Sequence, residues 1–236
     1  APGTGTWRTF TGRWENTKAN LESALKNALA HKADGILLTS WGDCGNHQPW
    51  ATIFPPLAYC AQLAWNGSQI DDSSLCVTLN RMVFHSSRKS KGPAQKILSA
   101  GSLDRTINSY LPNRSLTWNL IFETQRKELT RHVSSKHSEE SLEEGLKLLR
   151  SLRSESPETG ETPESILAHD EIDMGLDLSI FALERALSML RGRIVSSEGN
   201  LKLILQRYES LWPQRARLGG LKESLVLLEE GLSLAD

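Results

Sequence analysis

The chain has 236 residues, of which 39% are hydrophobic and 23% are charged, and its formal net charge is −1. These proportions suit a globular protein that buries an apolar core in one large domain or two small ones. A charge so close to zero excludes the strong positive field that recruits nucleic acid or an acidic membrane. The cluster of Arg88, Lys89, Lys91 and Lys96 has no aromatic residues interleaved, so we expect it on the solvated surface. We therefore expect neither nucleic acid nor a membrane as a partner.

Neither the cysteines nor the first residues of the chain indicate a specific function. Cys44, Cys60 and Cys76 are odd in number and unevenly spaced, which fits neither a disulfide framework nor a four-ligand zinc site. Cys44 and His47 are spaced like a metal pair, but no second pair follows, so we expect no metal and no other cofactor. No segment has the length of a membrane span and no signal peptide is visible, so the location stays unknown. A start at Ala1 without an initiator Met fits a processed chain or a fragment.

The first part of the chain alternates between strand and helix patterns. Residues 2–7 have the pattern of a turn or strand end, and residues 15–31 carry an apolar stripe at helical spacing. The apolar run at residues 36–38 predicts a buried strand over residues 35–40, and a helix is expected over residues 56–65. Such β/α units do not fold alone, because a parallel sheet needs both faces covered. Two strands cannot close a barrel, which takes eight strands and about 250 residues, so this part looks like the end of something larger.

From about residue 71 the pattern becomes helical. A polar loop is expected at residues 155–161, and Pro213 with the pair Gly219-Gly220 is expected to separate the last two helices. Frequent breaks and wide apolar stripes favour a helical subdomain or a bundle at a subunit interface, with a coiled coil as the alternative. We therefore divide the chain into residues 1–70 and residues 71–236. The expected helices cover residues 72–84, 94–100, 116–132 and 138–152, a long segment that begins at Thr162-Pro163, and residues 200–211 and 221–234.

The loop after residue 40 gathers the side chains that a sugar site needs. Trp41, Asp43, His47 and Gln48 follow the expected strand, and an α/β barrel places polar ligand sites at such strand ends. A tryptophan stacks on the apolar face of a sugar, and a carboxylate accepts hydrogen bonds from its hydroxyls. The pattern therefore predicts a carbohydrate site; the alternative is a core tryptophan and a turn-capping aspartate. The other early tryptophans, Trp14, Trp50 and Trp65, are expected to be packing residues.

Three segments resemble a known enzyme family: PGTGTW at residues 2–7, GRWENTKANLESALKNALAHKADGILLTSWGDCGNHQPW at residues 12–50, and PPLAYCAQLAWNG at residues 55–67. They resemble the end of the catalytic barrel in glycoside hydrolase family 20, above all its bacterial-type β-N-acetylhexosaminidases. Residues 208–225 resemble the C-terminal helical tail of those enzymes more weakly. The resemblance implies an α/β plus all-α fold: strands 7 and 8 of a (β/α)₈ TIM barrel within residues 1–70, then a helical C-terminal region over residues 71–236.

The resemblance also implies a reaction. The family removes terminal N-acetylhexosamine with retention of configuration, by a substrate-assisted mechanism in which the sugar's acetamido oxygen attacks the anomeric carbon. A carboxylic acid protonates the leaving oxygen, and the Asp preceding it in the family's consecutive Asp-Glu pair orients the acetamido group. The consecutive pair in this chain, Asp170-Glu171, falls in the expected helical tail, so the catalytic role is not carried onto it.

What the resemblance does carry over is the sugar-binding half of the site. It implies that Trp41 forms a wall of the pocket, that Asp43 binds the outer hydroxyls and that Trp7 is a further aromatic wall. His47 and Gln48 are implied as rim contacts.

Three hypotheses remain open. The chain is part of a β-N-acetylhexosaminidase and depends on missing strands; or it is a self-associating glycosidase in which Asp43 serves as acid or base; or it is a non-catalytic carbohydrate-binding and interaction protein. The balance leans towards a glycoside hydrolase. An uncovered sheet edge and apolar face predict association with a second copy or with a missing barrel segment, besides the N-acetylhexosamine-containing glycan.

Overall fold

The computed structural model describes residues 1–67, 69–86, 92–123, 133, 136–157, 159–192 and 198–233. Every regular element in these ranges is a helix, and extended segments pair only at an isolated parallel bridge between Gly3 and Thr39. The described part of the chain is therefore all-α. The prediction of β/α units from the end of a TIM barrel is wrong.

The two expected strands are extended segments that meet at one point. The backbone N–H of Thr4 donates to Thr39 O at 2.9 Å, and that of Thr39 donates to Pro2 O at 2.9 Å. Gly5 and Arg8 then take positive φ angles of 68° and 49°, so the first segment turns away directly after Thr4. A parallel ladder needs several consecutive residues on both strands, and the early turn leaves only this bridge.

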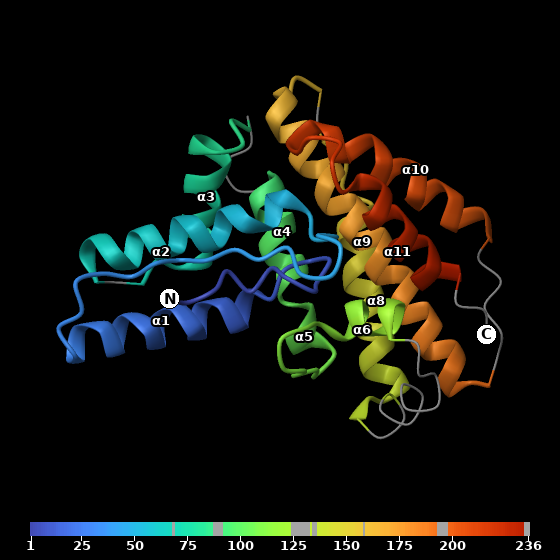
Figure 1. Cartoon of the computed structure of the whole chain (residues 1–236), viewed down its shortest axis with the longest axis horizontal. Helices are drawn as coiled ribbons and strands as arrows, with labels where there is room; N and C mark the ends of the chain where they lie inside the picture. Colours follow the sequence, from blue (N-terminus) through green and yellow to red (C-terminus); the bar gives the residue numbers. More distant parts are fainter. Residues whose placement is uncertain are drawn as a thin grey trace.

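Helices α1 (Trp14–Ala30) and α2 (Phe54–Asn66) lie beside these segments, at the left of Figure 1. They confirm the two helices expected in this part, and the short helix η1 (Trp50–Ile53), which was not expected, leads into α2. The Trp14 ring meets the Tyr59 ring edge-on, with centroids 5.4 Å apart. The apolar run expected to be buried is only partly so: Ile36 and Leu38 are half-buried against the core, whereas Leu37 is 69% exposed. Among the described residues no further strand forms a second layer over Leu37.

Helix α9 (Pro163–Leu190) is the centre of the remaining part, and packs against α4, α6, α8, α10 and η1. Thr162 caps it by accepting a hydrogen bond from Ser165 N, as the sequence predicts. Gly175 lets α9 approach the first part of the chain, because a Cβ there would lie 2.1 Å from the Phe10 carbonyl oxygen. The surrounding helices are α3 (Asp72–Met82), α4 (Pro93–Gly101), α5 (Leu103–Thr106), α6 (Leu116–Phe122), α8 (Glu139–Arg153), α10 (Glu198–Arg215) and α11 (Leu221–Ser233).

The hydrophobic core crosses the expected division at residue 70, because one cluster of buried side chains extends from Phe10 to Leu232. Helices α10 and α11 close this core on the right of Figure 1. Pro213 lies inside α10 and does not end it. Most of the second half of the helix expected over residues 116–132 lies outside the described residues. None of the described helices is both long and apolar enough to cross a bilayer.

The prediction that Lys96 lies on the solvated surface is wrong. Its side chain is fully buried, pairs with the Asp173 carboxylate and donates to Glu155 O at 2.8 Å. The rest of the expected basic cluster, Arg88, Lys89 and Lys91, lies outside the described residues.

Candidate functional site

Trp41 is exposed but firmly held. Its side chain is 57% exposed, while its indole N–H donates to Thr39 Oγ1 at 3.1 Å. Thr39 Oγ1 in turn donates to Pro2 O at 3.1 Å, next to the parallel bridge. The Gln48 side-chain amide donates to the Trp41 carbonyl oxygen at 2.7 Å. The ring is thus anchored at its polar edge and its backbone, which leaves an apolar surface available for stacking.

Asp43 lies beside the cationic side chain of Arg8, which was not among the expected site residues. Arg8 Nε is 4.0 Å from Asp43 Oδ2, and the two side chains are 31% and 41% exposed. That distance is an ion pair and too long for a hydrogen bond, so both groups keep capacity for a ligand. Arg8 also lies 5.5 Å from the centroid of the Trp118 ring, and its carbonyl oxygen accepts from Ser115 N at 3.0 Å. A positioned donor and acceptor at the surface suit a hydroxylated ligand.

Trp7 joins the same region through Gly3. A Cβ on Gly3 would lie 2.5 Å from Trp7 Cζ3, so the ring lies directly on this glycine. Gly3 is bridged to Thr39, which holds the Trp41 indole. Trp7 is half-buried, and the two tryptophans contact the two residues of one backbone bridge.

His47 and Gln48, expected at the rim, lie inside the molecule with 2% and 7% exposure. His47 Nε2 is 2.9 Å from Ser224 O, and its ring stacks on Phe122 with centroids 4.8 Å apart. Tyr208 of α10 lies 2.6 Å from Ser224 Oγ and packs against the same imidazole. These two residues therefore anchor the loop to the protein interior, and neither offers an exposed surface to a ligand.

The environment of His47 also fixes its protonation. Because the Ser224 carbonyl only accepts, Nε2 carries the proton of the neutral ring. Burial lowers the pKa of His47 to about 4, against a smaller opposing effect of the Ser224 and Cys44 backbones. The imidazole is neutral near pH 7.

The consecutive carboxylates Asp170 and Glu171 are engaged in ion pairs on α9. Glu171 is 3% exposed, and accepts from Arg215 Nε at 2.7 Å and from Ala51 N at 2.9 Å. Burial raises the pKa of Glu171 and the Arg215 guanidinium opposes this shift. Asp170 lies 3.7 Å from Arg207. Their partners make these carboxylates parts of the helix packing.

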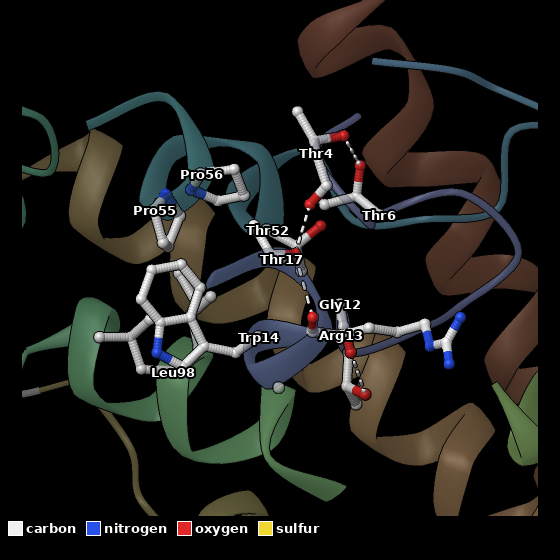
Figure 2. A pocket seen from close by; sticks show the side chains of 13 residues that line it. Thr4, Thr6, Gly12, Arg13, Trp14, Thr17, Thr52, Pro55, Pro56 and Leu98 are labelled. Atoms are coloured by element: carbon white, nitrogen blue, oxygen red, sulfur yellow. Dashed lines mark hydrogen bonds between the residues drawn. The ribbon is translucent and has the colours of Figure 1, made fainter. Parts of the chain in front are cut away.

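A cavity lined by threonine hydroxyls lies between the first segment, α1 and α2 (Figure 2). Thr17 Oγ1 lies 2.7 Å from Thr4 O and 3.0 Å from Arg13 O, and Thr4 and Thr6 hydroxyls are 2.8 Å apart. With a volume of about 10 Å³ the cavity has room for roughly one water molecule. The hydrogen bonds of these hydroxyls hold the first segment against α1, and the cavity is too small for a sugar.

The remaining candidates separate by burial. Trp14 is 4% exposed, as a packing residue should be, whereas Trp50 and Trp65 are 42% and 91% exposed, contrary to expectation. Cys44, exposed, and the buried Cys60 and Cys76 are free thiols. In the described ranges, no three His, Cys, Asp or Glu side chains cluster in a way that could hold a metal ion.

Neither a scan against protein-family models nor a search of curated proteins finds a match to this chain. The loop geometry and the motifs in residues 2–67 are therefore the features from which a function can be inferred.

Proposed function

We propose that residues 39–50 bind a terminal N-acetylhexosamine residue of a glycan, as the sugar-binding part of a β-N-acetylhexosaminidase-type site of glycoside hydrolase family 20. The observation that carries this proposal is Trp41, which is 57% exposed although its indole N–H and its carbonyl oxygen are both hydrogen-bonded. Exposing so large an apolar ring is unfavourable in water, and holding it in one orientation suits the stacking of a pyranose.

The polar groups beside the ring fit the same ligand. Asp43 accepts hydrogen bonds from sugar hydroxyls and Arg8 donates to them, while Trp7 supplies a second apolar wall. The Arg8 side chain is 31% exposed and its Nε makes no hydrogen bond within the described part of the chain, so the guanidinium as a whole remains available to a ligand oxygen.

Hydrolysis needs more than this loop supplies. A substrate-assisted mechanism requires an acid for the leaving oxygen and a carboxylate that orients the acetamido group. Since Asp170 and Glu171 are held in ion pairs, this chain alone binds the sugar without cleaving it. Release of chromophore from a chromogenic N-acetylglucosaminide by the purified chain would contradict that part of the proposal. Such turnover, if lost in Asp43→Asn, would instead favour Asp43 as an acid or base.

Titration with N-acetylglucosamine, followed by indole N–H chemical shifts, tests the binding. Trp41→Ala should weaken binding at least about tenfold, which corresponds to about 1.4 kcal/mol. Asp43→Asn should weaken it less, because the amide keeps one acceptor oxygen. Trp65→Ala is the matched control, since Trp65 is 91% exposed at the end of α2 and should leave the affinity unchanged. Equal affinities for the wild type and the three variants would contradict a sugar site at Trp41.

A second proposal concerns association. Leu29, at the end of α1, and Leu37, in the extended segment after it, are 67% and 69% exposed. Exposed leucines close together in sequence, beside an extended segment with one bridged partner, favour an interface with a second copy of the chain. Light scattering should give a dimer or larger, and Leu37→Lys should shift it to the monomer. A wild-type monomer at high concentration would contradict this.

A further inference from the structure

A groove lies between α8 and α9 and shares no lining residue with the loop at Trp41. Its volume is about 530 Å³, within the range of small-molecule sites, which extends from roughly 300 to 1,000 Å³. Leu146 and Leu187 line it at 5% exposure each, and its other lining side chains are charged or carry a hydroxyl. The groove is therefore large enough for a small molecule that has both apolar and polar parts.

Ion pairs cross the groove at both of its ends. At one end, the Arg150 guanidinium donates to Glu184 Oε1 at 2.8 Å. At the other end, about two helical turns away, Glu143 pairs with Arg191, whose Nε also donates to Glu139 Oε2 at 2.8 Å. The first pair is neutral, but Arg191 has two carboxylates as partners. The second end of the groove therefore keeps one excess negative charge.

Lys147 lines the groove between these two ends and has no carboxylate within ion-pair distance among the described residues. Glu143 precedes it by four residues, a spacing at which Glu and Lys side chains often pair on a helix, but here Glu143 pairs with Arg191 instead. Ser188 lines the groove from α9, and its hydroxyl makes no hydrogen bond within the described ranges. The middle of the groove thus offers an ammonium and a hydroxyl to a ligand.

Opposite charges are therefore separated within one groove, with an unpaired cation at Lys147 and an excess carboxylate at Glu143. A simple anion at Lys147 would be repelled by the carboxylates at the end of the groove, and a simple cation at Glu143 would be repelled by Lys147. A molecule that carries one charge of each sign is attracted at both positions.

We propose that this groove binds a small zwitterion, of which a free amino acid with an apolar side chain is the simplest case. Its carboxylate accepts hydrogen bonds from the Lys147 ammonium and the Ser188 hydroxyl, and its ammonium donates to Glu143. Its side chain packs on Leu146, Leu187 and the aliphatic stems of the charged residues that line the groove.

Three probes separate the two charges: L-phenylalanine, phenylalaninamide, which lacks the carboxylate, and N-acetylphenylalanine, which lacks the ammonium. Titrations of the whole chain are followed by the backbone amide chemical shifts of Leu146 and Ser188. Phenylalanine should bind at least about tenfold more tightly than either analogue, because each analogue loses one charge-assisted interaction.

Two substitutions assign these charges to residues. Lys147→Gln should weaken the binding of phenylalanine about tenfold and leave that of phenylalaninamide unchanged, because the amide has no carboxylate to contact the ammonium. Glu143→Gln should likewise weaken the binding of phenylalanine and leave that of N-acetylphenylalanine unchanged. Lys222→Gln is the matched control, since Lys222 is exposed in the first turn of α11 and lies outside the groove. Lys147 and Glu143 are exposed, so both variants should keep the fold, which a circular dichroism spectrum checks.

The wild type alone can contradict the zwitterion site. Phenylalanine that causes no saturable shift, or equal affinities for the three probes, would overturn it. A loss of affinity in Lys147→Gln no larger than that in Lys222→Gln would also overturn it. Discrimination among the probes by the wild type, with each variant losing only the matching discrimination, would support it.

Discussion

The loop over residues 39–50 is exposed at Trp41 and Asp43 in its first half and buried at His47 and Gln48 in its second half, before it reaches the partly exposed Trp50. In the first half, the side chains of Trp41 and Asp43 are 57% and 41% exposed. In the second half, His47 and Gln48 are 2% and 7% exposed, and each binds a backbone carbonyl oxygen. The difference teaches that one short loop can combine an exposed surface with buried anchoring residues. Here the buried imidazole and amide hold the exposed tryptophan and aspartate in place.

Within the loop, the largest expected effect is on stability, from His47→Ala. The substitution removes a stacked ring between Phe122 and Tyr208 and leaves the Ser224 carbonyl without its donor. We expect a loss of about 3 kcal/mol in the free energy of unfolding, from the cavity and the lost hydrogen bond together. Urea denaturation measures it. His47→Gln keeps a donor and should lose less; a change below about 0.5 kcal/mol in the alanine variant would show that this half does not anchor the loop.

The second prediction is an acid-sensitive stability that comes from His47. Its pKa falls from 6.5 to about 4 on folding, so the unfolded chain binds a proton at a higher pH than the folded protein does. Its contribution is complete above pH 6.5 and is lost as the pH falls towards 4. Because a pKa change of one corresponds to about 1.4 kcal/mol, this contribution is on the order of 3 kcal/mol.

The measurement is the midpoint of urea unfolding at intervals from pH 7.5 to pH 4, for the wild type and for His47→Gln. Glutamine retains a donor for Ser224 O and does not titrate. The wild type should lose stability faster than the variant across this window. Parallel curves would mean that the imidazole becomes protonated in the folded protein without penalty.

Ser224→Ala should have an intermediate effect. Ser224 Oγ donates to the Gly45 carbonyl oxygen and accepts from the Tyr208 hydroxyl, so it ties the loop to α10 and α11. Its removal leaves the Tyr208 hydroxyl with only its longer contacts, 3.5 Å from the Gly45 and Asn46 carbonyl oxygens, and should cost about 2 kcal/mol. Denaturation again measures the loss. If Tyr208→Phe combined with Ser224→Ala costs as much as the two single changes summed, the groups do not form one network.

Some elements of the fold could be predicted from the sequence and others could not. Helix starts depend on neighbouring residues, and the helices expected to begin at Thr162 and at Ser138 do begin there. The strand prediction failed because an apolar run such as residues 36–38 specifies only a preference. A strand also needs partners on both sides, and those depend on residues distant in the chain. Lys96 shows the same limit, since its partner Asp173 is on another helix.

For the site, residue types predicted a polar and aromatic loop, but not which of its side chains are exposed and which are buried. The partners that bury His47 come from Phe122, Tyr208 and Ser224, which lie 75 or more positions later in the chain. No pattern in the residues around His47 predicts these contacts. Arg8 was missed for a similar reason: it follows Trp7 directly, but its position beside Asp43 depends on the turn at Gly5 and Arg8.

The smallest expected effect on stability comes from Trp41→Ala. With 57% of its surface exposed, the ring contributes little to the core, so unfolding should change by less than about 0.5 kcal/mol. Trp14→Ala is the contrast: that ring is 4% exposed, and its removal should cost about 4 kcal/mol. Denaturation and sugar titration on the same Trp41→Ala sample separate the two roles of a tryptophan. A fold kept intact with sugar binding lost assigns the ring to the ligand. A loss of stability comparable to that of Trp14→Ala would assign it to the fold, and the exposed half of the loop would then be an anchor like the buried one.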